Sequence, residues 1–67
     1  MTAEVLLGRA LRVSGKPQES IAHLEKALNM APGSYEAHME MSQSLMLVNR
    51  KEEAMKFLEI ASGLKEN

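Results

Sequence analysis

Three groups of residues in this chain could do chemistry: a basic run bounded by glycines, a set of methionines, and two histidines. The run GRALRVSGK contains the two glycines and the lysine of a phosphate-binding loop. Such a loop needs four residues between its glycines and a serine or threonine after its lysine. Here six residues separate Gly8 from Gly15, and Pro17 follows Lys16. The run therefore does not predict a nucleotide site.

The methionines Met39, Met41 and Met46 carry soft thioether sulfurs of the kind that bind copper(I). However, Met39 and Met41 lie about 200° apart around a helix, because each residue advances by about 100°. Methionine also fills irregular gaps in hydrophobic surfaces. We therefore expect these side chains to pack in a core or a groove, and we expect no metal site.

Neither of the two histidines, His23 and His38, has a metal-ligand residue four positions after it in the chain. We expect His23 to pair with Glu19 on an exposed face. The chain has no cysteine, which excludes a thiol nucleophile and a cysteine-bound zinc. The sequence predicts a protein that is not an enzyme, with no catalytic residues and no cofactor.

Proline and glycine punctuate the 67 residues so that four helical patterns fill the spaces between them. The patterns predict helices over residues 3–14, 18–30, 35–48 and 51–64. Gly15 and Asn49 suit left-handed turns after the first and third helices, and Ser34 suits the N-cap of the third. No segment alternates as a strand does. The predicted fold class is all-α.

Each predicted helix carries a stripe of apolar and small residues that should be buried. In the first helix the stripe contains Ala3, Leu7, Ala10, Leu11 and Ser14. In the others it contains Ser20, Ile21, Leu24, Ala27 and Leu28, then Ala37, Met41, Ser44, Leu45 and Val48, then Ala54, Leu58 and Ala61.

The second half of the sequence matches the first half when position 37 is placed beneath position 3 and the rest follows in step. Six of the 33 aligned pairs are identical, where ordinary residue frequencies give roughly two. The identical pairs are Ala3 with Ala37, Leu11 with Leu45, Glu19 with Glu53, Leu24 with Leu58, Glu25 with Glu59, and Ala27 with Ala61. The turns also match, because Gly15 aligns with Asn49. The break at Pro32-Gly33 is therefore the boundary between two copies of one unit.

This period and its small and large positions resemble the tetratricopeptide repeat, a helix–turn–helix unit of about 34 residues. The first copy matches at Leu7, Gly8, Leu11, Ser20, Leu24, Ala27 and Pro32, and the second at Met41, Ser42, Leu45, Ala54, Leu58 and Ala61. The resemblance implies two tandem repeats, residues 1–34 and 35–67, whose four antiparallel helices form one structural domain of α–α superhelix type, either alone or within a longer array.

The resemblance also implies a non-catalytic scaffold that binds a peptide or a partner helix in a concave groove. This groove is formed by the first helix of each repeat. The helical wheel places one set of residues opposite the predicted buried stripes, with Leu6 and Glu40 at its border. The arginines in that set suit a carboxylate. We therefore expect the partner to contact Val5, Arg9, Arg12, Met39, Gln43 and Met46.

An alternative function is self-assembly. The last predicted helix has a second apolar stripe of Phe57, Ile60 and Leu64, which nothing in the chain is expected to cover. We expect this stripe to be covered in a homodimer, by exchange of a helical hairpin between chains, or by further repeats. Solution mass measured at several concentrations discriminates this hypothesis from the groove-binding one.

Charge and hydropathy limit the classes of partner. The net charge of −1 argues against nucleic-acid binding. No apolar run approaches the ~20 residues needed to span a membrane, and the N-terminus has no basic segment that leads into an apolar one. We therefore expect a soluble cytoplasmic protein whose partner is another protein or peptide.

Overall fold

The computed structural model describes residues 2–66, with side chains from residue 2 to residue 64, and this part of the chain forms four helices without a strand. Helix α1 spans Ala3–Val13, α2 spans Pro17–Met30, α3 spans Tyr35–Leu47 and α4 spans Lys51–Glu66. Each boundary lies within two residues of the predicted one. The prediction of an all-α fold is confirmed.

Side-chain caps fix where α1 and α3 begin. The Thr2 hydroxyl accepts a hydrogen bond from the Val5 N–H at 3.3 Å. The Ser34 hydroxyl accepts one from the Ala37 N–H at 3.2 Å, as the sequence predicted. Each cap satisfies a backbone donor that a helix start leaves without a partner.

Left-handed residues reverse the chain within each helical hairpin. Gly15 has φ of 84° and Asn49 has φ of 64°, so both turns have the predicted conformation. After Gly15, the Lys16 N–H donates to the Leu11 carbonyl at 2.8 Å, and the matching bond closes the second turn at 2.9 Å. The two turns are therefore built alike, at equivalent positions of the two copies.

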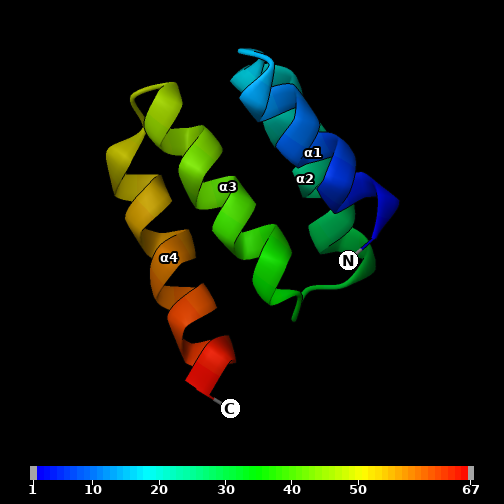
Figure 1. The fold of residues 1–67 in the computed structure, drawn as a ribbon. Coiled ribbons are helices and arrows are strands. Elements are labelled where there is room, and N and C mark those ends of the chain that lie inside the picture. The colour runs from blue at the N-terminus through cyan, green and yellow to red at the C-terminus, as the bar shows by residue number, and fades with distance from the viewer. Residues whose placement is uncertain (1, 67) are drawn as a thin grey trace.

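The helices form two hairpins, α1 with α2 and α3 with α4, that lie side by side (Figure 1). Helix α3 contacts both α1 and α2, so it occupies the groove between the helices of the first hairpin. Helix α4 packs against α3. Within residues 2–66, this arrangement leaves one side of α1 and one side of the second hairpin without a neighbouring helix.

The core lies where α3 meets the first hairpin. One cluster of buried side chains contains Ile21, Leu24, Met41, Leu45 and Ala54, and a second contains Val5, Ala27 and Ala37. In the same interface, the buried hydroxyls of Ser20 and Ser44 share a hydrogen bond of 2.8 Å. The bond satisfies both hydroxyls, which is the condition for burying them without a large penalty.

A close approach between α1 and α2 depends on a glycine. A Cβ atom added at Gly8 would lie 2.7 Å from Cγ and Cδ2 of Leu24, whose side chain is fully buried. Gly8 therefore gives Leu24 the space to pack against the backbone of α1.

Helix α1 buries a different face from the one predicted. Val5 is 1% exposed and Gly8 is buried, whereas Leu7 is 41% exposed and both Ala3 and Ala10 are exposed. The predicted stripe is the equivalent of the stripe that α3 buries against the first hairpin. Within the described residues α1 contacts only α2 and α3, and these lie against its other face.

The predicted stripe of α4 is also only partly buried. Ala54 and Ala61 are 2% and 0% exposed, but Leu58 is 47% exposed. Its equivalent in the first hairpin, Leu24, is 0% exposed. The difference arises because α3 covers Leu24, whereas no helix in the part of the chain that the structure describes covers Leu58 in the same way.

Candidate partner-binding groove

Helices α3 and α4 form a groove on the side of the second hairpin that faces away from the first. The groove has a volume of about 250 Å³, and α3 and α4 both contribute to its lining. The lining residues are Met39, Ser42, Gln43, Met46, Ala54, Met55 and Leu58. Apart from Ser42 and Gln43, every lining side chain is apolar.

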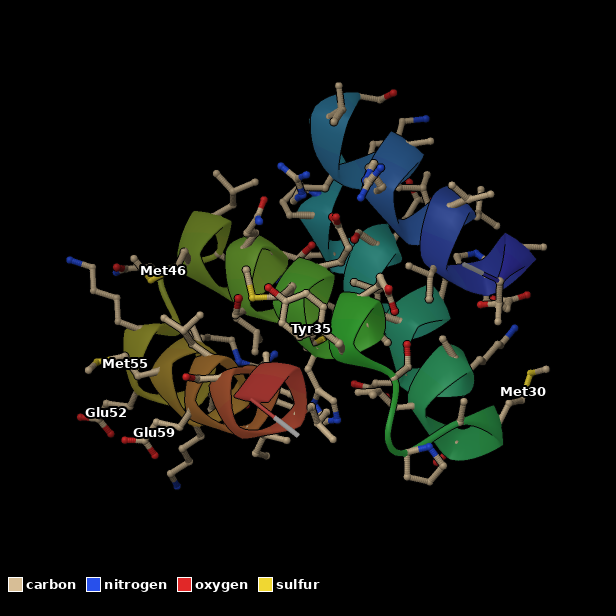
Figure 2. All side chains as sticks on the ribbon, turned by 60° about the horizontal axis from the view of Figure 1, so that its bottom comes forward. Met30, Tyr35, Met46, Glu52, Met55 and Glu59 are labelled. Atoms are coloured by element: carbon tan, nitrogen blue, oxygen red, sulfur yellow. The ribbon has the colours of Figure 1, made fainter. Side chains whose placement is uncertain are left out.

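The groove exposes its large apolar side chains to solvent. Met46 is 50% exposed, Met55 62% and Leu58 47%. Figure 2 shows Met46 and Met55 at the same edge of the molecule, with Met30 at the opposite edge. The buried hydroxyl of Ser42 donates to the Met39 carbonyl at 2.7 Å, so it needs no polar partner from a ligand. Contiguous exposed apolar side chains of this kind mark interaction sites.

Three of the six residues predicted to contact a partner therefore line one groove: Met39, Gln43 and Met46. The sequence did not indicate that α4 forms the other wall through Met55 and Leu58. A signal was available, because these two residues align with the core residues Ile21 and Leu24. Their apolar type follows from the repeat, but their exposure follows from the arrangement of the hairpins.

Val5 does not belong to an accessible groove, which corrects the prediction for this residue. Its side chain is 1% exposed and packs in the cluster with Ala27 and Ala37. The wheel placed it opposite the stripe assumed to be buried. Because α1 packs through its other face, Val5 lies in the core.

The two arginines of α1 hold a carboxylate from within the chain. The Arg9 Nε–H donates to one oxygen of Glu40 at 3.0 Å, and the Arg12 Nε–H donates to the other at 3.1 Å. The Glu40 side chain is 6% exposed, whereas the side chains of Arg9 and Arg12 are 47% and 20% exposed. The sequence predicted that these arginines contact a carboxylate on a partner, whereas the carboxylate that they bind in the structure is Glu40 of the same chain.

The predicted self-association stripe is not continuous. Phe57 is half-buried and packs against the larger core cluster, and its ring lies 5.7 Å from that of His38. Leu64 is also half-buried, and Ile60 is 48% exposed. The expectation that nothing in the chain covers this stripe is therefore wrong for Phe57, because α3 covers part of it.

The histidines contact other residues than expected. The His23 Nδ1–H donates to Glu4 at 3.0 Å, which joins α2 to α1, so the predicted pair with Glu19 is wrong. His38 is buried and its Nε2–H donates to the Pro32 carbonyl at 2.8 Å. His23 thus connects the helices of the first hairpin, and His38 connects α3 to the loop before it.

A second hollow, on the side of α2 and α4, carries charged groups at its rim. Glu25, Arg50 and Glu53 contribute to its lining. Arg50 donates to Glu53 through Nε at 2.9 Å. This hydrogen bond lowers the pKa of Glu53 and raises the pKa of Arg50, and the charge of Glu25 raises the latter further. Both groups of the pair are exposed, so salt should weaken their attraction.

The described part of the chain contains no group of three or more histidine, cysteine or acidic side chains placed to hold a metal ion. None of its helices has the length and the apolar content that crossing a membrane requires.

Comparison with known proteins identifies the fold family. The sequence model of the tetratricopeptide repeat matches residues 11–65, which is most of the chain. No curated protein and no solved structure gave a significant match. Tetratricopeptide repeats are generally non-catalytic and mediate protein–protein interactions. The extent of the match, together with two alike helical hairpins, shows that this chain belongs to the tetratricopeptide repeat family.

Proposed function

We propose that this protein is a non-catalytic interaction module that binds an amphipathic partner helix in the groove between α3 and α4. The observation that carries the proposal is the apolar lining of this groove, with Met46, Met55 and Leu58 about half exposed or more. Docking of a helix's apolar face into a hydrophobic groove is a common recognition mode.

The proposed partner binds mainly through apolar side chains. Covering the exposed parts of Met46, Met55 and Leu58 would contribute about 1 kcal/mol each, roughly half the value for complete burial of such a side chain. Methionine side chains adapt to different partner shapes. These contributions predict weak to moderate affinity and tolerance toward the partner's sequence.

An acidic group on the partner is a secondary feature of this proposal. Arg9 and Arg12 together carry one more charge than Glu40 neutralises, and the Arg9 side chain is 47% exposed. An acid beside Arg9 would therefore gain a partly screened attraction. Raising the salt concentration should weaken binding only slightly, because the apolar contacts do not depend on it.

Methyl NMR of the methionines tests the proposal. The probe is a designed amphipathic peptide of leucine and lysine with helical spacing, and a scrambled peptide of the same composition is its control. We expect the helical peptide to shift the methyl signals of Met39, Met46 and Met55. Met30 should not shift, because it is 72% exposed at the opposite edge of the molecule.

A matched pair of variants completes the test. Met55→Lys places a charge in the groove and should abolish the peptide's effect on Met39 and Met46. Met30→Lys makes the same change on an exposed methionine outside the groove and should leave the effect intact. Equal shifts at Met30 and in the groove, or no shift with the helical peptide, would contradict the proposal.

A further inference from the structure

The groove between α3 and α4 is the equivalent of the site that holds α3 in the first hairpin. Each residue that lines the groove has an equivalent one repeat earlier in the chain. In the first hairpin these residues contact α3: two arginines bind Glu40, Ser20 bonds to Ser44, and Ile21 and Leu24 pack in one cluster with α3. The equivalents are Val5, Gly8, Arg9, Arg12, Ser20, Ile21 and Leu24.

The exposed face of α1 is the equivalent of the face by which α3 enters that site. In α3 the docked face contains Ala37, Glu40, Met41, Ser44 and Leu45, all of which are buried. The equivalents in α1 are Ala3, Leu6, Leu7, Ala10 and Leu11, of which Leu6 is 50% and Leu7 41% exposed. The molecule therefore presents both halves of its own internal interface, one at each end.

The charged contact of the internal interface has an apolar counterpart on both open surfaces. Inside the molecule Arg9 and Arg12 bind Glu40. The equivalent of Glu40 on α1 is Leu6, and the equivalents of the arginines are Gln43 and Met46. The acidic residue on one side of the interface and the basic residues on the other are thus both replaced by uncharged residues on the open surfaces. A leucine entering the α3–α4 groove meets a thioether and an amide there, and no unpaired charge is buried.

The buried hydroxyl pair shows the same joint replacement. Ser20 and Ser44 share a hydrogen bond of 2.8 Å inside the molecule. Their equivalents are Ala54 in the groove and Ala10 on α1. If only one side had kept its serine, docking would bury a hydroxyl without a partner. Both sides carry alanine, so the contact would be apolar throughout.

Two charges at the edge of the internal interface keep their sign on the open surfaces. Glu25 and Arg50 both line the hollow on the side of α2 and α4. The equivalent of Glu25 is Glu59, which lies on α4 and is labelled in Figure 2. The equivalent of Arg50 is Lys16, directly before α2. Opposite charges would therefore also lie at this edge of the docked interface.

We propose that copies of this chain associate head to tail, with the exposed face of α1 in one copy docked in the α3–α4 groove of the next. This inference rests on the proposed function of the groove and names its partner. The contact joins two different surfaces, so it leaves a free α1 face and a free groove on every assembly that does not close on itself. Repeating the internal arrangement of hairpins gives an open stack that grows with concentration.

The test measures solution mass across a hundredfold dilution by light scattering or sedimentation. The wild-type chain should exceed 7.4 kDa and grow with concentration. Leu6→Glu should reduce the mass to that of the monomer, because it brings a carboxylate to a groove without arginines. Gln43→Arg combined with Met46→Arg should do the same from the groove side. All three positions are exposed, so circular dichroism should show folded variants.

Combining the two kinds of variant gives the decisive measurement. A mixture of the Leu6→Glu chain with the doubly substituted chain should assemble again, because Glu at position 6 then meets two arginines as Glu40 does. A single chain with all three substitutions should also assemble. Both results require that Leu6 of one copy lies against Gln43 and Met46 of another.

Val13→Glu is the matched control on α1. Val13 is 71% exposed, and its equivalent Leu47 is 59% exposed even though α3 is docked. This position therefore lies outside the proposed contact, and the variant should assemble as the wild type does. Equal loss of assembly in Val13→Glu and Leu6→Glu would contradict the inference.

Some outcomes would contradict head-to-tail association alone, and others would also contradict helix binding in the α3–α4 groove. A wild-type mass of 7.4 kDa at every concentration, with groove methyl signals that still respond to the designed peptide, would overturn only self-docking. Loss of both responses would overturn the groove as well. Assembly that survives Leu6→Glu but is lost in Ile60→Lys would identify a contact through α4 and would contradict the head-to-tail arrangement.

Discussion

At the scale of single residues, Gly8 and Gly63 are both glycines inside α-helices, but their surroundings differ. A Cβ atom at Gly8 would lie 2.7 Å from two carbons of the buried Leu24, whereas a Cβ atom at Gly63 would meet nothing within 4 Å. Replacing a helical glycine by alanine stabilises a helix by about 0.5–1 kcal/mol. Overpacking a core costs about 1–3 kcal/mol.

We therefore expect Gly8→Ala to lower the free energy of unfolding and Gly63→Ala to raise it. Urea denaturation followed by circular dichroism measures both, and Gly63→Ala serves as the control for helix propensity. A stabilised Gly8→Ala variant would mean that α1 and α2 can move apart without loss, which would contradict the close approach.

The contact of Glu40 with Arg9 and Arg12 is a second residue-scale feature with a measurable effect. Glu40→Gln keeps the shape but removes the charge, and a hydrogen bond to a charged group contributes about 1.5–3 kcal/mol. We expect thermal unfolding to show a loss of that order. The same change at an exposed acid such as Glu36 should cause almost none.

The uncharged residues that replace Glu40 and its two arginines on the open surfaces can be tested inside the molecule. Glu40→Leu with Arg9→Gln and Arg12→Met copies the apolar set into the internal interface. Such replacement of buried ionic groups is often neutral or stabilising by about 1–4 kcal/mol. We expect the triple variant to be at least as stable as the wild type, although Glu40→Leu alone should be destabilised. A triple variant as unstable as the single one would contradict this expectation.

The exposed pair of Arg50 and Glu53 predicts a small pH effect. Because the hydrogen bond from Arg50 lowers the pKa of Glu53 in the folded state, the pair stabilises the fold above the ordinary pKa of glutamate. That stabilisation is lost as the pH falls through the lowered value. We expect Arg50→Gln to raise the pKa of Glu53, as measured by NMR titration, and Lys56→Gln to raise it less.

At the scale of helices, α2 and α4 have equivalent sequences but different environments. Leu24 of α2 is 0% exposed and Leu58 of α4 is 47% exposed. Leu24→Ala should cost about 2–5 kcal/mol, the usual cost of lost burial together with a cavity. A domain of this size has a total stability of roughly 3–10 kcal/mol, so this variant should be largely unfolded at moderate temperature.

Leu58→Ala is the control for that prediction. In dilute solution it should reduce the free energy of unfolding far less, because its side chain is already half exposed. Equal losses in dilute solution would mean that α4 is covered as fully as α2. Circular dichroism during urea denaturation measures both variants under one set of conditions.

At the scale of the whole molecule, stability should depend on protein concentration. An assembly that forms only from folded chains stabilises the folded state by mass action. The midpoint of thermal unfolding should therefore rise with concentration in the wild-type chain and stay constant in Leu6→Glu. A concentration-independent midpoint in both would contradict head-to-tail association.

Much of the fold could be predicted because it depends on local chemistry. Ser34 caps α3 and Asn49 adopts the left-handed conformation at the end of the third helix. Both follow from what these side chains do to a neighbouring backbone. The internal repeat then implied that the second hairpin copies the first. These features need no knowledge of distant contacts, and the structure has them.

The candidate site was predicted less completely, because it depends on which neighbour each helix has. Met39, Gln43 and Met46 were identified by their place on the helical wheel, but Leu58 was assumed to be covered and Met55 was not assigned to the groove. Glu40 was assigned to a border, although its carboxylate lies within 3.1 Å of both arginines. Its partners are distant in sequence, beyond the reach of any local pattern.

The sequence by itself determined where helices begin and end, that two units are alike, and that each helix carries a stripe able to be buried. Only the tertiary structure decided which stripe is buried. Helix α1 has apolar side chains on two faces, Val5 on one and Leu7 on the other. Hydrophobic burial is non-directional, so the wheel cannot choose between the faces. The choice is made by α3, which packs against Val5 and leaves Leu7 to the solvent.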